Sequence, residues 1–412
     1  MPCRQRPAGG FVAVVTKQIE AGRALTDIYP ARFCTLCRKE DAMSKQRIQL
    51  SDHFTYSRLL RFVLPCIGTM LFTSIYGIVD GLCVSNFVGK TAFAAVNLIM
   101  PVPMLVGSVG FMLGTGGSAI VGITLGEGDQ KKADRYFTLF LLAALVSVSV
   151  LAVLGIVFLR PIAVLLGAKG ELLDYAVRYG RILMVSLPTF ALQNMFQSFF
   201  VTAEKPHLGF WFTVGAGCTN MVLDVLMVGV WGWGVEGAAI ATFISQLVGG
   251  VLPVFYFIDR SNSSRLHLCK TSFYSKVLRD ACINGSSELM TNLSMSLVNI
   301  LYNYQLLRLA GENGVAAYGV IMYAAFLFVA VFVGYAVGSA PIVSFHYGAR
   351  NHAEVHNLYR KSLRLIAVVA VTLTLASMFI IPCVARIFVG YDAELLALTS
   401  RAFRLYALSF LI

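Results

Sequence analysis

The sequence predicts an all-α, polytopic membrane protein. The chain has 412 residues, of which 57% are hydrophobic and only 13% are charged, whereas soluble domains carry about a quarter charged residues. Apolar stretches long enough to cross a bilayer core as helices, roughly 20 residues each, recur along most of the chain. They are too long and too continuously apolar for the strands of a membrane barrel. Helices are therefore the spanning elements to expect, since only helices and closed barrels satisfy the backbone in lipid.

Ten apolar segments are expected to form helices, with Gly, Pro and charged residues at the breaks between them. The second and eighth segments are longer than a bilayer requires, so we expect them to tilt or to extend beyond it. In order, the segments cover residues 59–81, 92–125, 137–159, 174–202, 208–230, 235–258, 282–309, 314–345, 362–389 and 397–412.

The two halves of the chain share a pattern at an offset of 222 residues. Gly116 matches Gly338 and Gly126 matches Gly348, in one ungapped register. Glycines at helix ends are position-specific, so such matches are hard to obtain from apolar composition alone. The offset predicts two parallel, pseudo-symmetric six-helix lobes. The chain stops inside its tenth segment, so we expect the second lobe to be truncated, with about ten helices present.

Four regions follow from this pattern. Residues 1–54 form a tail, 55–258 the amino-terminal lobe, 259–281 an inter-lobe loop and 282–412 an incomplete carboxy-terminal lobe. The tail before Met43 has no clear period, long apolar run or signal-peptide pattern. We therefore expect Met43 to be the biological start.

The positive charges indicate orientation. Of the 33 Lys and Arg residues, 24 fall on the side of the tail and the inter-lobe loop and 9 on the other side. Cytoplasmic loops carry such an excess, so the amino-terminus is expected in the cytoplasm and the chain in the plasma or inner membrane. The net charge of +12 is spread through short loops. This distribution sets membrane orientation and argues against a nucleic-acid partner.

Three acids stand inside the predicted spans: Asp80, Asp224 and Glu288. Ionisable groups in a bilayer cost several kcal/mol, so each one is a functional candidate. Asn220 precedes Asp224 by one helical turn and shares its face, and Thr242 on the next span adds a hydroxyl. Carboxylate, amide and hydroxyl oxygens suit a hard cation, and a desolvated Asp can also carry a proton. The alternative interpretation of each acid is that it lies at the end of a helix, where interfacial water solvates it.

Pro65 lies inside the first span, where it removes a backbone hydrogen bond and can bend the helix. It is either a tolerated kink or a hinge that responds to Asp80.

The Gly89-Lys-Thr91 motif resembles the end of a phosphate-binding loop, but Val84 occupies the position of the required first glycine. We therefore do not expect transport driven by ATP hydrolysis. No nucleophile–base pair or metal-ligand cluster is present in the sequence, so we do not expect an enzyme either.

These motifs resemble the multidrug and toxic compound extrusion (MATE) transporters over residues 55–412. Pro65 and Asp80 fifteen positions later look like helix one of that family, and the run from Gly116 to Asp129 looks like the end of its second helix and the following loop. The spacing Asn220-x-x-x-Asp224, followed by Thr242, looks like its amino-lobe cation site. The resemblance implies twelve helices in two lobes around a central cleft.

By the same resemblance, Asp80, Asn220, Asp224 and Thr242 would bind Na⁺ or H⁺, and Pro65 would be the bending point. The second half departs from the family, because Glu288 is not clearly at the acidic position that some members use. A further set of residues is expected to line the cleft, with helix packing as the alternative for the asparagines. This set is Tyr76, Glu288, Asn292, Asn299 and Asn303.

The leading functional hypothesis is an antiporter that exports lipophilic, cationic drugs in exchange for Na⁺ or H⁺, as a monomer in the lipid bilayer and without a cofactor. One alternative is a flippase for lipid-linked oligosaccharides, which would be expected to have a more cationic cleft. Another is a membrane sensor or assembly protein without transport, which would be expected to carry a folded soluble domain. The sequence identifies neither the drug nor the coupling ion.

Overall fold

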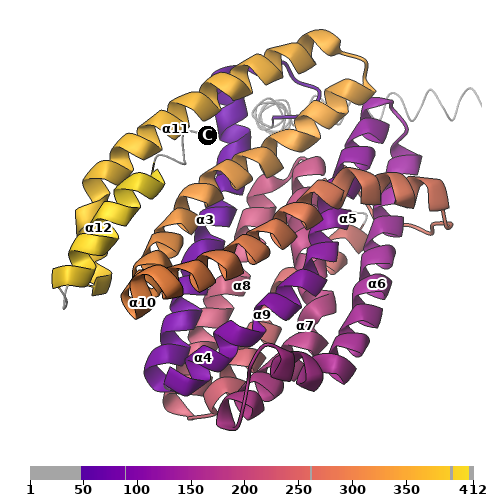
Figure 1. Cartoon of the computed structure of the whole chain (residues 1–412). Coiled ribbons are helices and arrows are strands. Elements are labelled where there is room, and N and C mark those ends of the chain that lie inside the picture. The colour runs from indigo at the N-terminus through magenta and orange to yellow at the C-terminus, as the bar shows by residue number, and fades with distance from the viewer. Residues whose placement is uncertain (1–47, 89, 260–261, 390–392, 408–412) are drawn as a thin grey trace, which may run out of the picture. The chain divides into compact units, whose positions relative to one another are not determined.

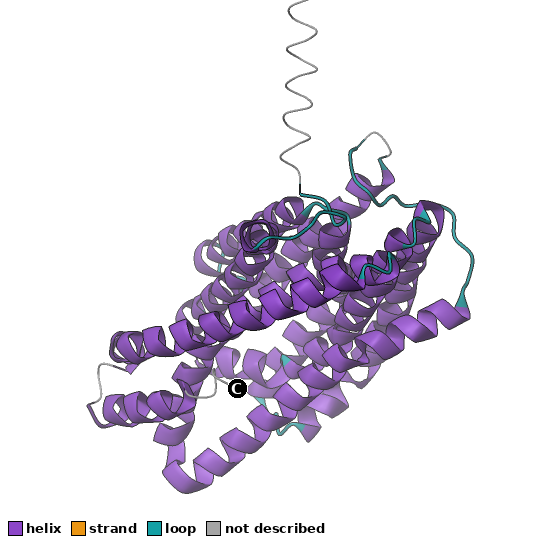
Figure 2. Cartoon of the chain, turned by 90° about the horizontal axis from the view of Figure 1, so that it is seen from above, coloured by secondary structure: helices purple, strands orange, loops and turns teal. Residues whose placement is uncertain are grey.

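The computed structural model describes residues 48–88, 90–259, 262–389 and 393–407. In these ranges the chain consists of helices joined by short loops, with no strand (Figure 2). Residues 50–412 form one compact unit, to which all of these helices belong. The expected start at Met43 lies outside the described residues. The helices are α3 (Tyr56–Phe87), α4 (Lys90–Ile99), α5 (Pro101–Gly126), α6 (Gln130–Leu165), α7 (Glu171–Thr202), α8 (Pro206–Asp224), the π-helical η1 (Val225–Val230), α9 (Gly234–Ile258), α10 (Ser275–Gly348), α11 (His352–Val389) and α12 (Ala393–Ala407) (Figure 1).

Each of the ten predicted apolar segments coincides with these helices over its described residues, which confirms the all-α fold class. The second segment is divided at Met100, where Pro101 begins α5. Six stretches of the described helices are long and apolar enough to cross a membrane. They are Tyr56–Gly77, Pro101–Gly126, Gln130–Leu165, Pro206–Val230, Gly234–Ile258 and Ala325–Gly348.

Helix α7 is not among those six, although it has 32 residues. It packs on α5, α6 and α9 and therefore lies largely within protein. A helix surrounded by other helices does not need a fully apolar surface. This explains how α7 accommodates Gln193 and Asn194, both buried.

Helix α10 is folded back on itself. The rings of Tyr302 and Tyr318 stack with their centroids 5.4 Å apart, whereas 16 residues of straight helix would separate them by about 24 Å. The orange ribbon accordingly runs across the bundle and returns (Figure 1). The reversal gives a first arm up to Tyr302 and a second arm from Tyr318. These arms correspond to the seventh and eighth predicted segments.

The 222-residue repeat is visible in the packing of α5 against the second arm of α10. A Cβ at Gly126 would overlap the carbonyl oxygen of Phe345, and a Cβ at Gly348 would overlap that of Ile123. Gly126 and Gly348 are repeat equivalents, and so are Ile123 and Phe345. The two contacts are therefore reciprocal, as expected across a pseudo-twofold axis.

The same symmetry relates two further contacts, in which the first helix of each half packs on the opposite half. A Cβ at Gly116 of α5 would lie 2.7 Å from the backbone nitrogen of Gly285 in the first arm of α10. The equivalent Gly338 faces Val63 of α3, and a Cβ at Gly338 would lie 2.9 Å from Val63 Cγ1. Val63 and Gly285 are themselves 222 residues apart. The repeat found in the sequence therefore describes the arrangement of the helices.

The loop between α9 and α10 is held along α6 at every second residue. Gln130 Nε2 donates to the carbonyl oxygen of Arg265, and the backbone nitrogen of His267 donates to Asp134 Oδ1 at 3.0 Å. Cys269 N then donates to Thr138 Oγ1 at 3.1 Å. Side chains one helical turn apart on α6 thus pair with alternate residues of an extended chain.

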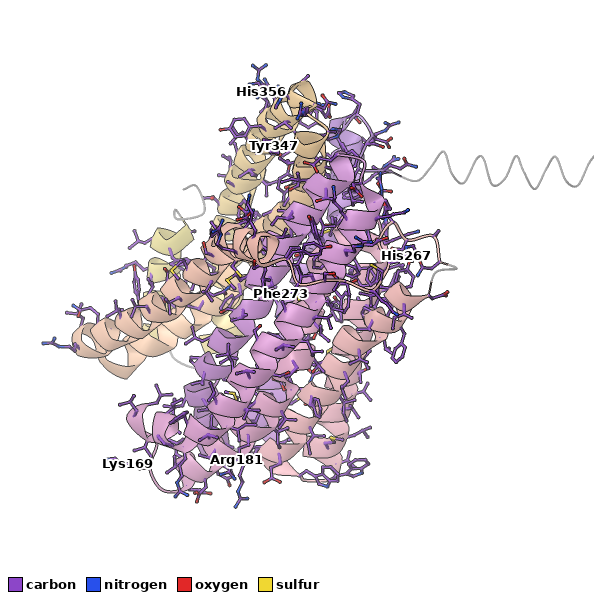
Figure 3. The ribbon with its side chains drawn as sticks, turned by 90° about the vertical axis from the view of Figure 1, so that its right-hand side faces the viewer. Lys169, Arg181, His267, Phe273, Tyr347 and His356 are labelled. Carbon is purple, nitrogen blue, oxygen red and sulfur yellow. The ribbon has the colours of Figure 1, made fainter. Side chains whose placement is uncertain are left out.

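This loop lies at one end of the bundle. Figure 3 shows His267, Tyr347 and His356 toward that end, and Lys169 and Arg181 at the opposite end. We call the first end the linker face. It comprises residues 50–55, 126–129, 203–205, 262–274 and 349–351.

Candidate functional site

Helices α8 and α9 bring together three of the predicted site residues. Asn220 and Asp224 lie one turn apart on α8 and are 1% and 0% exposed. Asn220 Nδ2 donates a hydrogen bond to Thr242 Oγ1 of α9 at 3.5 Å. The expected sharing of one helix face by Asn220 and Asp224 is therefore present in the structure.

Helix α3 contributes the fourth residue, Asp80. It is 9% exposed and interacts electrostatically with Asp224. Helix α3 packs closely on α8 because Gly217 has no side chain: a Cβ there would overlap the ring of Phe72. This close approach places an aspartate from each helix in the same buried region.

Most of the oxygen atoms in this cluster have no partner. Within the part of the chain that the structure describes, Asp80 Oδ1, Asn220 Oδ1 and both carboxylate oxygens of Asp224 are buried without a hydrogen bond. Leaving such groups unpaired costs about 1–3 kcal/mol each, and more when they are charged. An arrangement of acceptors that lacks donors is satisfied when it binds a cation or takes up protons. The cluster fits either one.

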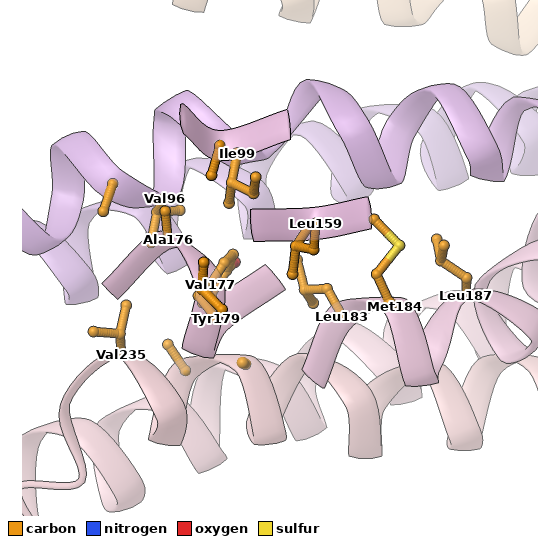
Figure 4. Close-up of a cluster of buried hydrophobic side chains, with 14 of the residues drawn as sticks. Val96, Ile99, Leu159, Ala176, Val177, Tyr179, Leu183, Met184, Leu187 and Val235 are labelled. Carbon is orange, nitrogen blue, oxygen red and sulfur yellow. The ribbon is translucent and has the colours of Figure 1, made fainter. Parts of the chain in front are cut away.

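Tyr179 of α7 belongs to the same region and was not predicted. Its ring is fully buried in the hydrophobic cluster formed by α4, α6, α7 and α9 (Figure 4). Its hydroxyl is buried without a partner and interacts electrostatically with Asp80 and Asp224. A buried Tyr hydroxyl usually finds a hydrogen-bond partner. In the sequence Tyr179 stands between Arg178 and Arg181, so nothing local marks it as part of a buried site.

A π-helical turn, η1, begins directly after Asp224, where the sequence suggested a continuous α-helix. Trp231 N donates to the carbonyl oxygen of Leu226, five residues earlier, at 2.8 Å. Such turns insert one residue into a helix and are frequent at functional sites. The turn places a local irregularity of the backbone next to the most buried acid of the cluster.

Pro65 lies outside this cluster, about four turns before Asp80 on α3. It is buried, and its carbonyl oxygen accepts a hydrogen bond from Thr69 Oγ1 at 2.9 Å. A cavity of about 10 Å³ beside it is lined in part by Cys66, Thr69 and Met70. That volume corresponds to about one water molecule.

The predicted place of Tyr76, Glu288, Asn292, Asn299 and Asn303 in a cleft stays a prediction. Tyr76 is half-buried and packs on α8, with Cδ1 3.0 Å from a Cβ placed on Gly217. Asn292 Nδ2 donates to the carbonyl oxygen of Glu288 at 2.9 Å, within its own helix. Glu288 is half-buried. The side chains of Asn299 and Asn303 lie outside the described residues.

A helical bundle with several membrane-spanning stretches, two pseudo-equivalent halves and a buried cluster of oxygen atoms defines a membrane transport protein. The comparison with known families specifies which kind. A family model described as MatE matches residues 65–226 and 289–412. The chain belongs to this family of transporters, which confirms the resemblance seen in its sequence, and it is a transporter rather than an enzyme.

Similar proteins support this assignment. Multidrug export protein MepA of Staphylococcus saprophyticus is 22% identical over 316 residues, 76% of this chain and 69% of the relative. A crystal structure of MATE in complex with MaL6 superposes with a TM-score of 0.81 at 23% identity, over 86% of this chain and 79% of that one. The outward-facing conformation of a multidrug resistance MATE family transporter gives 0.80 at 24% identity, over 86% and 78%. These structures share the fold.

Proposed function

We propose that the chain is a secondary active antiporter that exports lipophilic, cationic drugs in exchange for Na⁺ or H⁺. The cluster of unpartnered oxygens around Asp80 and Asp224 is the observation that carries the proposal. Two buried acids that have no basic partner among the described residues attract a cation. The name of the MepA relatives, multidrug export protein, supports drugs as the substrate class.

The exchange follows from the electrostatics of the cluster. With a cation or protons bound, the acceptors from α3 and α8 are satisfied and the two helices remain together. Without them, the two aspartates repel each other in a region of low dielectric constant. This difference favours a rearrangement of α3 relative to α8, with Pro65 as its bending point. Cation and drug then favour different states of the protein, which is the requirement for exchange.

The gradient supplies the energy for transport. Entry of one positive charge releases about 2.3 kcal/mol per 100 mV of membrane potential.

The proposal places the protein in the plasma or inner membrane. The linker face lies on the cytoplasmic side, because most of the Lys and Arg residues fall on that side. Fusion of a cytoplasm-dependent fluorescent reporter after Asp259 tests this orientation, and a dark but stable fusion would reverse it.

The test of the cluster is ethidium export by cells that express the full chain. Asp80→Asn and Asp224→Asn should each abolish export without preventing membrane insertion, because each removes one ionisable acceptor. Asp174→Asn is the matched control, since this acid lies exposed in the first turn of α7, away from the cluster. Full export by both cluster variants would refute the assigned site.

The coupling ion is assigned by a separate experiment. In vesicles that contain the purified chain, export is measured with Na⁺ replaced by K⁺ and then with the pH gradient collapsed. Loss of export in only one condition identifies the ion. Export that persists in both would exclude antiport against either ion.

A further inference from the structure

The segment that precedes α3 is held from both halves of the chain. Residues 50–54, called the strap here, include Leu50 and Phe54, both fully buried. Leu50 N donates to Glu204 Oε1 at 2.9 Å, just after α7. Phe54 N donates to Glu354 Oε1, also at 2.9 Å, in the first turn of α11. Two carboxylates from opposite halves thus hold backbone nitrogens four residues apart.

Several groups form the attachment to α11, whereas the Glu204 carboxylate that binds Leu50 N is shared with Arg265. Glu354 is 6% exposed, and its second oxygen lies 2.6 Å from His53 Nδ1. Lys361 Nζ donates to the carbonyl oxygen of Phe54 at 2.6 Å, so both polar groups of the Phe54 backbone are bound to α11. Hydrogen bonds to buried charged groups are worth about 1.5–3 kcal/mol each.

The strap crosses the place where the two halves meet. Next to it, the ring of Phe54 contacts that of His346 edge-on, with centroids 6.4 Å apart. His346 follows Phe345, whose carbonyl oxygen lies against Gly126. Opening of the linker face requires α5 and the second arm of α10 to separate at this contact. The same motion would carry Glu204 away from Glu354.

The strap limits this motion. It contains a turn at residues 50 and 51 and a bend at residue 52, and four residues of fully extended chain span at most roughly 14 Å. Once the halves move farther apart than the strap can reach, one of the two carboxylates must release its backbone nitrogen.

The two halves differ at this position. Glu354 is the repeat equivalent of Lys132, and their caps are equivalent too: Asp129 Oδ1 accepts from Lys132 N, and Asn351 Oδ1 accepts from Glu354 N. Lys132 instead forms an exposed ion pair with Asp129, at 2.9 Å. The capping geometry is thus shared, whereas the hold on the strap comes from Glu354.

We propose that the strap is a releasable lock that keeps the linker face closed, with Glu354 as its main clasp. The inference rests on the proposed function, because a transporter that exchanges substrates must open this face in part of its cycle. The lock sets the ratio of closed to open states. It does so without contact with the cation cluster.

The test measures opening directly. Ser344, half-buried in the contact between α5 and α10, is replaced by cysteine in a full-length chain whose nine native cysteines are changed to serine or alanine. The purified protein, in lipid nanodiscs, is labelled with a bulky maleimide. Glu354→Ala should raise the labelling rate about tenfold. Glu354→Gln keeps an oxygen acceptor but loses the charge, and should raise the rate severalfold.

Two controls separate the lock from general loosening. Lys132→Ala, at the equivalent position of the other half, should leave labelling of Ser344→Cys unchanged. A second reporter, Val148→Cys, is fully buried within the first half and should stay protected in all variants. Unchanged labelling at Ser344→Cys, or an equal rise at both reporters, would overturn the proposal. If Glu354→Ala does not fold, Glu354→Gln and Lys361→Met decide the question in the same way.

This assay requires no drug and no ion gradient, so its result does not depend on whether the proposed function is correct. A wild-type chain that exports no dye would refute drug export while the labelling result stands. Normal export with labelling that ignores Glu354 would refute only the lock.

Discussion

Gly126 and Gly348 occupy equivalent places on two helices that pack against each other, and each lies against a carbonyl oxygen of the opposite helix. The pair marks where the first and second halves touch near the linker face. Any side chain at either position would force the helices apart.

Gly126→Ala should therefore destabilise the protein by about 2–3 kcal/mol, because the added methyl group meets backbone that cannot rotate away. Gly215→Ala in α8 is the matched control, since nothing lies within 4 Å of its Cβ position. Its effect should range from neutral to a gain of about 1 kcal/mol in helix propensity. Thermal unfolding in detergent compares the two, and equal melting temperatures would contradict the packing described.

Tyr179→Phe should leave stability unchanged or slightly raised, because the hydroxyl that it removes has no hydrogen-bond partner. The concentration of coupling cation needed for half-maximal export should rise severalfold, since one oxygen of the cluster is lost. Melting temperature and the cation dependence of ethidium export measure the two effects. A large drop in melting temperature with unaltered cation dependence would assign Tyr179 to packing alone.

Glu354 should make stability depend on pH. Burial would raise the pKa of this carboxyl, but hydrogen bonds from Phe54 N, His53 and Asn357 outweigh burial and lower it below the usual 4.5. A carboxylate with a lowered pKa in the folded state stabilises the protein above its unfolded pKa, and this contribution is lost as the pH falls through the folded pKa. The advantage in melting temperature of the wild type over Glu354→Gln should shrink as the pH falls below 4.5. A difference that grows toward acid pH would reverse the assigned sign.

Much of the fold was predictable because apolar run length and the glycine register are local properties of the sequence. Asn220 and Asp224 could be placed on one face from helical periodicity alone, and Asp80 was marked by the cost of a charge in a bilayer. Their roles as cation ligands stay predictions until they are tested.

Other features depend on contacts between distant segments and left little local signal. Tyr179 lies about 100 residues from Asp80 in sequence, and its proximity follows from how α7 packs. The π-helical turn after Asp224 has no simple residue signature. The strap was missed because residues 50–54 carry no periodic pattern.

The loop between the halves also limits how far they can travel. Its residues are bonded to α6 as far as Thr271, whose hydroxyl donates to the carbonyl oxygen of Arg135 at 2.8 Å, and α10 begins at Ser275. From Thr271 to Ser275 the covalent tether is about four residues long, or roughly 14 Å when fully extended, and the ring of Tyr274 within it packs on Tyr136 of α6 with centroids 5.5 Å apart. While these hydrogen bonds persist, the start of α10 stays within that distance of α6. A larger displacement would first have to break the bonds between the loop and α6.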